Sequence, residues 1–234
     1  MDHSLFDNRK YPVVDAREGY GEWAKTYEQI VQDVMDLRMF NWVQSVDWAS
    51  ADAILDLACG TGRIGQWLRQ LTSAPIDGVD FTPQMLSQAH DRGLYRNLTE
   101  ASVTQTGLSD AVYDLCVQSL ADEHLPELEP LYAEVARLTR PGGQFVIVGV
   151  HPQFFMQGMP THFDRDSGET VTIRTYVHLL SDHVQSALAA GWTLQEMHEG
   201  LIDDDWMQVK PKWRKHYGQP ISFVMVWRKN ASAT

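Results

Sequence analysis

Short apolar runs alternate with amphipathic stretches through the first two thirds of the chain. Clear runs cover 53–57, 76–79, 112–120 and 144–150, and a weaker run covers 98–103. Runs of this length, bounded by turn residues and rich in β-branched side chains, are typical of strands that are buried on both faces. We therefore expect five strands in this part of the chain.

The stretches between these runs predict helices. Residues 63–71 carry apolar side chains at spacings of three and four, which form one stripe of an amphipathic helix. A second helix begins at Thr82 and Pro83 with an N-cap and a proline in the first turn, and a third covers 128–138. Strands that alternate with helices predict a doubly wound α/β fold, a Rossmann-like sheet with helices on both faces.

After the fifth strand the pattern loosens. Residues 151–175 are rich in Gly, Pro, Phe and Met, and a helix is expected over 181–190. Two further strands are expected near 192–198 and 221–228, separated by an irregular stretch with no helix long enough for a parallel crossover. We therefore expect an antiparallel last pair and a sheet of seven strands.

The 234 residues fit a single domain, since α/β domains often exceed 200 residues. We divide it into an N-terminal helical lid (1–50), a cofactor-binding core (51–150), a substrate-pocket insert with C-terminal elements (151–220), and a last strand with a frayed tail (221–234).

The charge balance bears on partners. The formal net charge is -12, so the surface should repel a nucleic acid, and the short cluster at 210–215 is read as a charged loop. No apolar run approaches the roughly 18 residues of a membrane span, and the N-terminus has no secretory pattern, so we expect a soluble, cytoplasmic protein. Two cysteines, Cys59 and Cys116, are too few for a metal cluster, and the acidic run 203–205 is read as a solvated loop, so no metal is expected.

The candidate chemistry is concentrated after the first strand. Gly60, Gly62 and Gly65 satisfy a dinucleotide-type spacing, although a plain tight turn would also need glycines. Asp56 precedes them at the end of a buried strand, where an unpaired carboxylate is costly and a cationic partner is expected. The α-ammonium group of S-adenosylmethionine supplies that charge, whereas a pyrophosphate would be repelled.

A second acid, Asp80, ends the next strand. It is placed to accept hydrogen bonds from ribose hydroxyls, to cap the following helix, or to do both. Phe81 and Met85 are candidates to flank an adenine ring, with Met85 equally suited to the core.

Four segments, ILDLACGTGRIG, GVDFTPQML, VYDLCVQSL and LTRPGGQFVIV, resemble the successive motifs of class I S-adenosylmethionine-dependent methyltransferases of the small-molecule type. The resemblance implies a seventh strand antiparallel to its neighbours and S-adenosylhomocysteine as the product. It also implies cofactor contacts from Asp56, Ala58, Gly60, Gly62 and Asp80.

Further positions follow from the same resemblance. Ser102 and Val103 lie where family members often place an Asp near adenine, and Gln118 lies at a position next to the methionine moiety. Tyr20, with its aromatic neighbours Trp23 and Tyr27, resembles the N-terminal lid of small-molecule members; an amphipathic helix packed on the sheet is the alternative.

Methyl transfer from a sulfonium requires that the acceptor atom be aligned with the methyl group. A hydroxyl or protonated amine acceptor also needs a base to take its proton. His124 and His151 follow the fourth and fifth strands at the sheet edge where ligands bind, with Glu123 alongside, and are the candidate bases; a hydrogen-bonded structural histidine is the alternative for each. The apolar segment 152–160 is expected to wall an acceptor pocket or to form a homodimer contact.

Two other functions fit parts of this pattern. A nicotinamide-dependent reductase fits the glycine spacing but not the charge of Asp56. A non-methylating, nucleoside-binding relative fits the whole fold.

Overall fold

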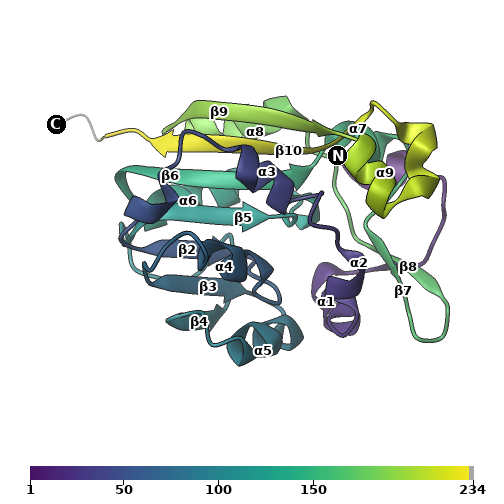
Figure 1. The fold of residues 1–234 in the computed structure, drawn as a ribbon, viewed down its shortest axis with the longest axis horizontal. Coiled ribbons are helices and arrows are strands. Elements are labelled where there is room, and N and C mark those ends of the chain that lie inside the picture. Colours follow the sequence, from purple (N-terminus) through teal and green to yellow (C-terminus); the bar gives the residue numbers. More distant parts are fainter. Residues whose placement is uncertain (232–234) are drawn as a thin grey trace.

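The computed structural model describes residues 1–231 and contains a seven-stranded sheet in the order β4-β3-β2-β5-β6-β10-β9 (Figure 1). The strands, in sequence order, are β2 Ile54–Leu57, β3 Ile76–Asp80, β4 Asn97–Glu100, β5 Tyr113–Ser119, β6 Thr139–Val150, β9 Trp192–Leu201 and β10 Pro220–Lys229. The first five are parallel, and β10 lies antiparallel between β6 and β9. The predicted α/β, Rossmann-like fold with an antiparallel seventh strand is confirmed.

Helices cover both faces of this sheet. Helices α6 (Glu129–Leu138) and α8 (Leu180–Ala189) contribute to one hydrophobic cluster, and α3 (Leu37–Trp42) and α4 (Arg63–Leu68) to another. Strand β6 shows why the central runs are apolar throughout, because Phe145 belongs to the first cluster and the next residue, Val146, to the second. Helix α5 (Pro83–Asp91) follows β3 and contacts β4.

The N-terminal segment forms several short helices, two of which lie beyond the carboxyl ends of the strands. They are η1 His3–Leu5, α1 Ala16–Trp23, α2 Tyr27–Ile30, α3 and η2 Trp48–Ser50, with α1 and α2 beyond the strand ends in Figure 1. Gly19 permits close approach of α1 to the insert, because a Cβ at this position would lie 2.8 Å from Cγ1 of Ile173.

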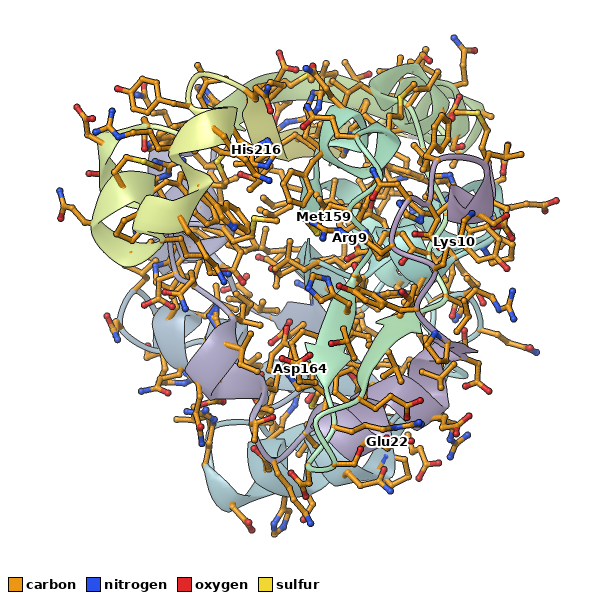
Figure 2. The ribbon with its side chains drawn as sticks, turned by 90° about the vertical axis from the view of Figure 1, so that its right-hand side faces the viewer. Arg9, Lys10, Glu22, Met159, Asp164 and His216 are labelled. Atoms are coloured by element: carbon orange, nitrogen blue, oxygen red, sulfur yellow. The ribbon has the colours of Figure 1, made fainter. Side chains whose placement is uncertain are left out.

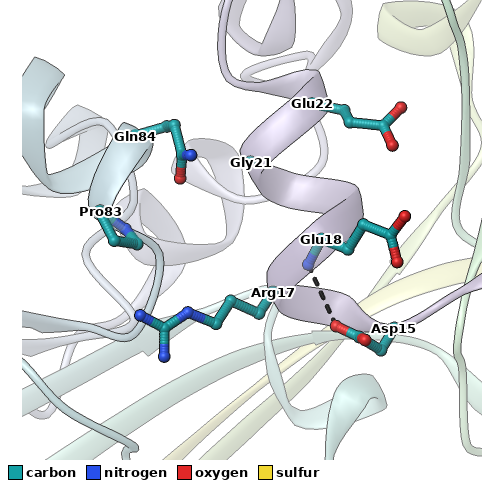
Figure 3. A pocket seen from close by; sticks show the side chains of 7 residues that line it. All are labelled: Asp15, Arg17, Glu18, Gly21, Glu22, Pro83 and Gln84. Carbon is teal, nitrogen blue, oxygen red and sulfur yellow. Dashed lines mark hydrogen bonds between the residues drawn. The ribbon is translucent and has the colours of Figure 1, made fainter.

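An open surface depression marks the other side of α1, where it meets the start of α5 (Figure 3). Gly21 faces Gln84 there, and the Asp15 side chain caps α1 by accepting a hydrogen bond from the Glu18 amide at 3.1 Å. Arg17, which also lines the depression, pairs with Glu100. The ion pair between Arg17 and Glu100 therefore links α1 to the end of β4.

The insert is more ordered than its composition predicted. It forms a three-stranded sheet in the order β1-β8-β7, from Val13–Val14, Thr170–Ile173 and His162–Asp164. The expectation of a loose insert over 151–175 is corrected, since β8 pairs in parallel with β1 from the N-terminal segment and buries Val171 and Ile173. Such short strands carry little local signal, and their pairing is set by distant residues.

Other elements complete the chain. They are η3 Asp122–His124, α7 Pro152–Met156, α9 Asp204–Val209 and η4 Pro211–His216. Strand β6 begins at Thr139, before the expected 144, because Thr139 pairs with Tyr113 ahead of an irregularity in the register. The prediction of a frayed tail falls partly on residues 232–234, which lie outside the described residues.

Candidate functional site

An inner cavity lies where β2, β3 and β5 end, beneath α1 and α2. Its lining includes eight of the predicted cofactor residues: Tyr20, Ala58, Gly60, Asp80, Phe81, Met85, Ser102 and Val103. His124, one of the two candidate bases, also lines it. The sheet topology thus brings together residues that the sequence spreads over a hundred positions.

The glycine turn after β2 leaves one wall of this cavity open. Gly60 has φ +53°, and a Cβ placed there would meet nothing nearer than the carbonyl oxygen of Ala58 at 4.0 Å. Ala58 itself has φ +52°, a conformation that costs a residue with a Cβ about 1 to 2 kcal/mol. Because the space beyond Gly60 is free, a ligand can approach the backbone closely there.

Asp80 connects this turn to α5. One carboxylate oxygen accepts from the Gly60 amide at 2.9 Å and the other from the Thr82 amide at 2.8 Å. Burial raises the pKa of this carboxyl above its usual value. Asp80 therefore fixes the first helical turn, as one of the two sequence interpretations holds, and also lines the cavity, as the other requires.

Asp56 is placed differently from the expectation. Its side chain is buried, accepts a 2.6 Å hydrogen bond from the Tyr95 hydroxyl, and does not line the inner cavity. Burial raises its pKa to about 7, so in the unliganded chain this carboxyl has a neutral donor and is partly protonated at neutral pH. Its second oxygen has no partner among the described residues.

Gly62 and Gln118 also lie behind the cavity wall. The amide of Gln118 is fully buried, and neither its nitrogen nor its oxygen has a partner within the described chain. A buried amide left unpaired is costly, so a ligand atom is the natural partner for this group. The cofactor contacts of Asp56, Gly62 and Gln118 stay predictions.

His124 is bound on both ring nitrogens. Nδ1 lies 2.7 Å from the Arg174 carbonyl oxygen and Nε2 lies 2.9 Å from the Tyr20 hydroxyl. A carbonyl can only accept, so Nδ1 carries the proton and Nε2 accepts from Tyr20. Burial lowers the pKa of His124 to about 4, which leaves a neutral ring that positions Tyr20.

An outer cavity of about 650 Å³ adjoins the inner one, and Tyr20, Tyr27 and Leu120 line both. Its wall is mainly aromatic and includes Trp23, Tyr27, Phe154, Phe155, Trp206 and Trp213. The volume and lining are those of a site for a small organic molecule. The apolar segment 152–160 contributes to this wall, as one of its two predicted uses requires.

Glu123 is the carboxylic acid in the depth of the outer cavity. It is 3% exposed, and its Oε2 has no partner among residues 1–231. Burial, with Asp122 beside it, raises its pKa well above the usual range. A carboxyl group of this kind takes up a proton readily near neutral pH.

The other histidines lie apart from this arrangement or at its edge. His151 lines neither cavity; its Nδ1 accepts from the Gln153 amide at the start of α7, and its Nε2 lies 2.8 Å from Glu199. His183 packs in the core against Tyr132, whereas His162 lines the outer cavity. The proposal of His151 as a base therefore has no support from geometry.

Sequence reasoning missed two buried pairs near the site. Tyr95 reaches Asp56 from the loop before β4, and Arg63 forms a 2.7 Å ion pair with Asp36, which also accepts from Ser119 at 3.0 Å. The one available signal in the sequence was the position of Arg63 directly after the glycine turn, which places a cation next to the site. The partners come from remote segments and carry no local pattern.

Within the described residues there is no cluster of three or more His, Cys, Asp or Glu side chains that could hold a metal ion. Among residues 1–231, no helix is both long enough and apolar enough to cross a membrane.

One family model and several known proteins are similar to this chain. The methyltransferase domain model matches residues 55–147, which hold the glycine turn, Asp80 and strands β2 to β5. The ubiquinone/menaquinone biosynthesis C-methyltransferase UbiE of Bdellovibrio bacteriovorus is 31% identical over 104 residues, 42% of this chain and 44% of that protein. Over these residues the chain is similar to the class I S-adenosylmethionine-dependent methyltransferases.

Two further similarities cover more of the chain than the family model does. Methyltransferase-like protein 27 of Homo sapiens is 34% identical over 137 residues, 53% of each chain. An S-adenosylmethionine-dependent methyltransferase from Mesorhizobium loti has the same fold, with a TM-score of 0.65 at 17% identity over 84% of this chain and 98% of that one. The chain thus spans about half the length of these two curated relatives.

The charge of the inner cavity suits the donor S-adenosylmethionine. Its lining contains Asp80 and neither Lys nor Arg, so it suits a cation and disfavours a pyrophosphate. The open wall at Gly60 leaves room for a ligand to contact the backbone, while a contact with the unpaired amide of Gln118 stays a prediction. This charge pattern opposes the reductase alternative.

Proposed function

We propose that the protein transfers a methyl group from S-adenosylmethionine in the inner cavity to a small organic molecule in the outer cavity. The observation that carries this proposal is the junction of the two cavities at Tyr20, Tyr27 and Leu120. A donor on one side and an acceptor on the other would face each other across that junction, as an in-line displacement requires.

The bound donor would supply a sulfonium methyl group and a good leaving group, so a protein nucleophile is unnecessary. The chain's own residues align the two molecules and exclude water. Tyr20 stacks on Trp23 at 5.8 Å and hydrogen bonds to His124, which fixes the ring at the junction. We assign Tyr20 a positioning role.

The proton of a hydroxyl or amine acceptor needs a base. Glu123 supports this role better than His124 or His151, because it faces the outer cavity and has an oxygen without a partner in the described chain. Its raised pKa suits proton uptake near neutral pH. We propose Glu123 as the base for acceptors that must lose a proton.

Calorimetric titration with S-adenosylhomocysteine and with NADH tests the donor assignment. We expect the first to bind and the second to show no heat of binding. Incubation with S-adenosylmethionine and a panel of small hydroxyl, amine and carboxylate compounds then tests transfer, with S-adenosylhomocysteine formation as the readout. Binding of NADH would favour the reductase, and binding of S-adenosylhomocysteine without turnover on any compound would favour the non-methylating relative.

A further inference from the structure

The mouth of the outer cavity is positively charged in a protein whose formal net charge is -12. Four cationic side chains line it: Arg9, Lys210, Lys212 and Lys215. Figure 2 faces this mouth, where Arg9, Met159 and His216 are seen above Asp164. Two carboxylates, Glu123 and Asp164, are the acidic side chains of the same lining.

None of these four cations forms an ion pair with a carboxylate within residues 1–231. The acids nearest to them in sequence are engaged elsewhere, because Asp203 binds Arg38 at 2.9 Å and Asp204 accepts from Tyr217 at 3.2 Å. Most other arginines of the chain do have acidic partners. Four of the cations without an ion pair in residues 1–231 therefore line this one cavity.

Packing holds part of this charge in place. Trp206 is buried and stacks on Trp213 at a centroid distance of 5.0 Å. The ammonium group of Lys210 lies 4.7 Å from the centre of the Trp213 ring, a cation–π arrangement that limits its freedom. Lys212, next along η4, is exposed and adds to the field at the mouth. Burial and the nearby Lys212 lower the pKa of Lys210, as is expected of a cation without a counter-charge.

The interior of the same cavity is apolar and aromatic, with Phe154 and Trp213 in contact at 5.5 Å between ring centres. A ligand that satisfies both regions is amphiphilic. We infer that the acceptor joins an apolar body, which occupies the outer cavity, to an anionic carboxylate or phosphate group that lies against Arg9, Lys210 and Lys212 at its mouth. This inference rests on the proposed function, since it names the class of acceptor for that site.

The consequence is that charge selects the acceptor. Several cations at the mouth raise both the association rate and the affinity of an anionic ligand. The apolar walls bind neutral and charged analogues equally well. The discrimination is therefore visible in compounds that share one ring system and differ in a single group.

The test uses three naphthalene compounds, naphthoate, naphthyl phosphate and neutral naphthamide, titrated calorimetrically into the full chain saturated with S-adenosylhomocysteine. We expect at least one anion to bind about tenfold more tightly than the amide, the scale of one hydrogen bond to a charged group, and its affinity to fall with added NaCl. The tighter of the two anions identifies the group as carboxylate or phosphate.

The double variant Arg9→Gln/Lys212→Gln should abolish this preference, and both side chains are exposed, so folding is preserved. Arg214→Gln is the matched control, since Arg214 is an exposed cation of the same η4 that does not line the cavity. Equal binding of anion and amide, no binding of either anion, or equal losses in the double variant and Arg214→Gln would overturn the inference. Failure of S-adenosylhomocysteine to bind would instead count against the proposed function itself.

Discussion

The hydroxyl of Tyr20 lies 2.9 Å from Nε2 of His124, and the two side chains join helix α1 to η3, which follows β5, beside the inner cavity. His124 in turn is anchored through Nδ1 to the carbonyl of Arg174 in the segment after β8. The lid, the core and the insert therefore meet at this pair. Because both ring nitrogens of His124 are hydrogen bonded, its neutral imidazole is suited to orient Tyr20. It is not suited to accept a proton from a substrate.

His124 should stay neutral across the physiological range. Burial lowers its pKa to about 4, so its ring should show no protonation between pH 5 and 8 when followed by NMR. Tyr20→Phe removes the hydroxyl that donates to Nε2 and should move the His124 titration upward. A wild-type pKa near 6.5 would contradict the neutral ring that burial is expected to enforce.

Glu123→Gln tests the base. Because the pKa of Glu123 is raised, the carboxylate that accepts a proton forms only as the pH rises above neutral, so kcat/KM should climb with pH through that pKa. The variant should lose this climb and about 10²- to 10⁴-fold of the rate at high pH, on an acceptor found in the activity screen. Asp164→Asn, an exposed acid of the same cavity lining, should keep the wild-type profile. An unchanged profile in Glu123→Gln would refute the assignment.

Gly60→Ala should weaken S-adenosylhomocysteine binding by at least about tenfold, because its Cβ enters the open wall of the inner cavity. The control is Gly107→Ala, which has a similar positive φ of +73° and open surroundings but does not line the cavity. Both variants should lose similar stability in urea, about 1 to 2 kcal/mol, and only the first should lose affinity. Equal affinities would show that no ligand approaches Gly60.

Asp80→Asn keeps the size of the side chain but removes one of the two acceptors that hold the Gly60 and Thr82 amides. Affinity for S-adenosylhomocysteine should fall by about 1 to 3 kcal/mol in calorimetric titration. Asp91→Asn, an exposed acid at the end of α5, should bind normally. An unaltered Kd in Asp80→Asn would argue against a ribose contact.

Asp56 should make stability depend on pH in a defined direction. Its pKa is near 7 in the folded chain and 3.8 in the reference state, so the folded state binds more protons between these values. The free energy of unfolding of the unliganded protein should therefore fall as pH rises from 4 to 7, by up to about 4 kcal/mol from this group. Between pH 5 and pH 8, the free energy of unfolding measured in urea should fall more in the wild type than in Asp56→Asn. An equal fall in both proteins would refute the raised pKa of Asp56.

The sequence determined the parts of the protein that depend on local pattern. Apolar runs placed β2, β3, β5 and β10 to within a few residues, because a strand buried on both faces must be apolar along its whole length. The glycine turn and Asp80 were identified because each follows directly from a strand end, where the backbone requirement is local. The fold and family followed from these elements in order.

Only the tertiary structure decided the contacts between distant segments. The hydrogen bond from Tyr95 to Asp56 and the place of Glu123, rather than His151, in the lining of the outer cavity could not be predicted from the sequence. The pairing of β8 with β1 and the presence of Arg9 and Lys212 in the lining of one cavity likewise have no signature in either segment alone. A side chain's burial, partner and pKa depend on what the rest of the chain brings against it, and no local pattern contains that.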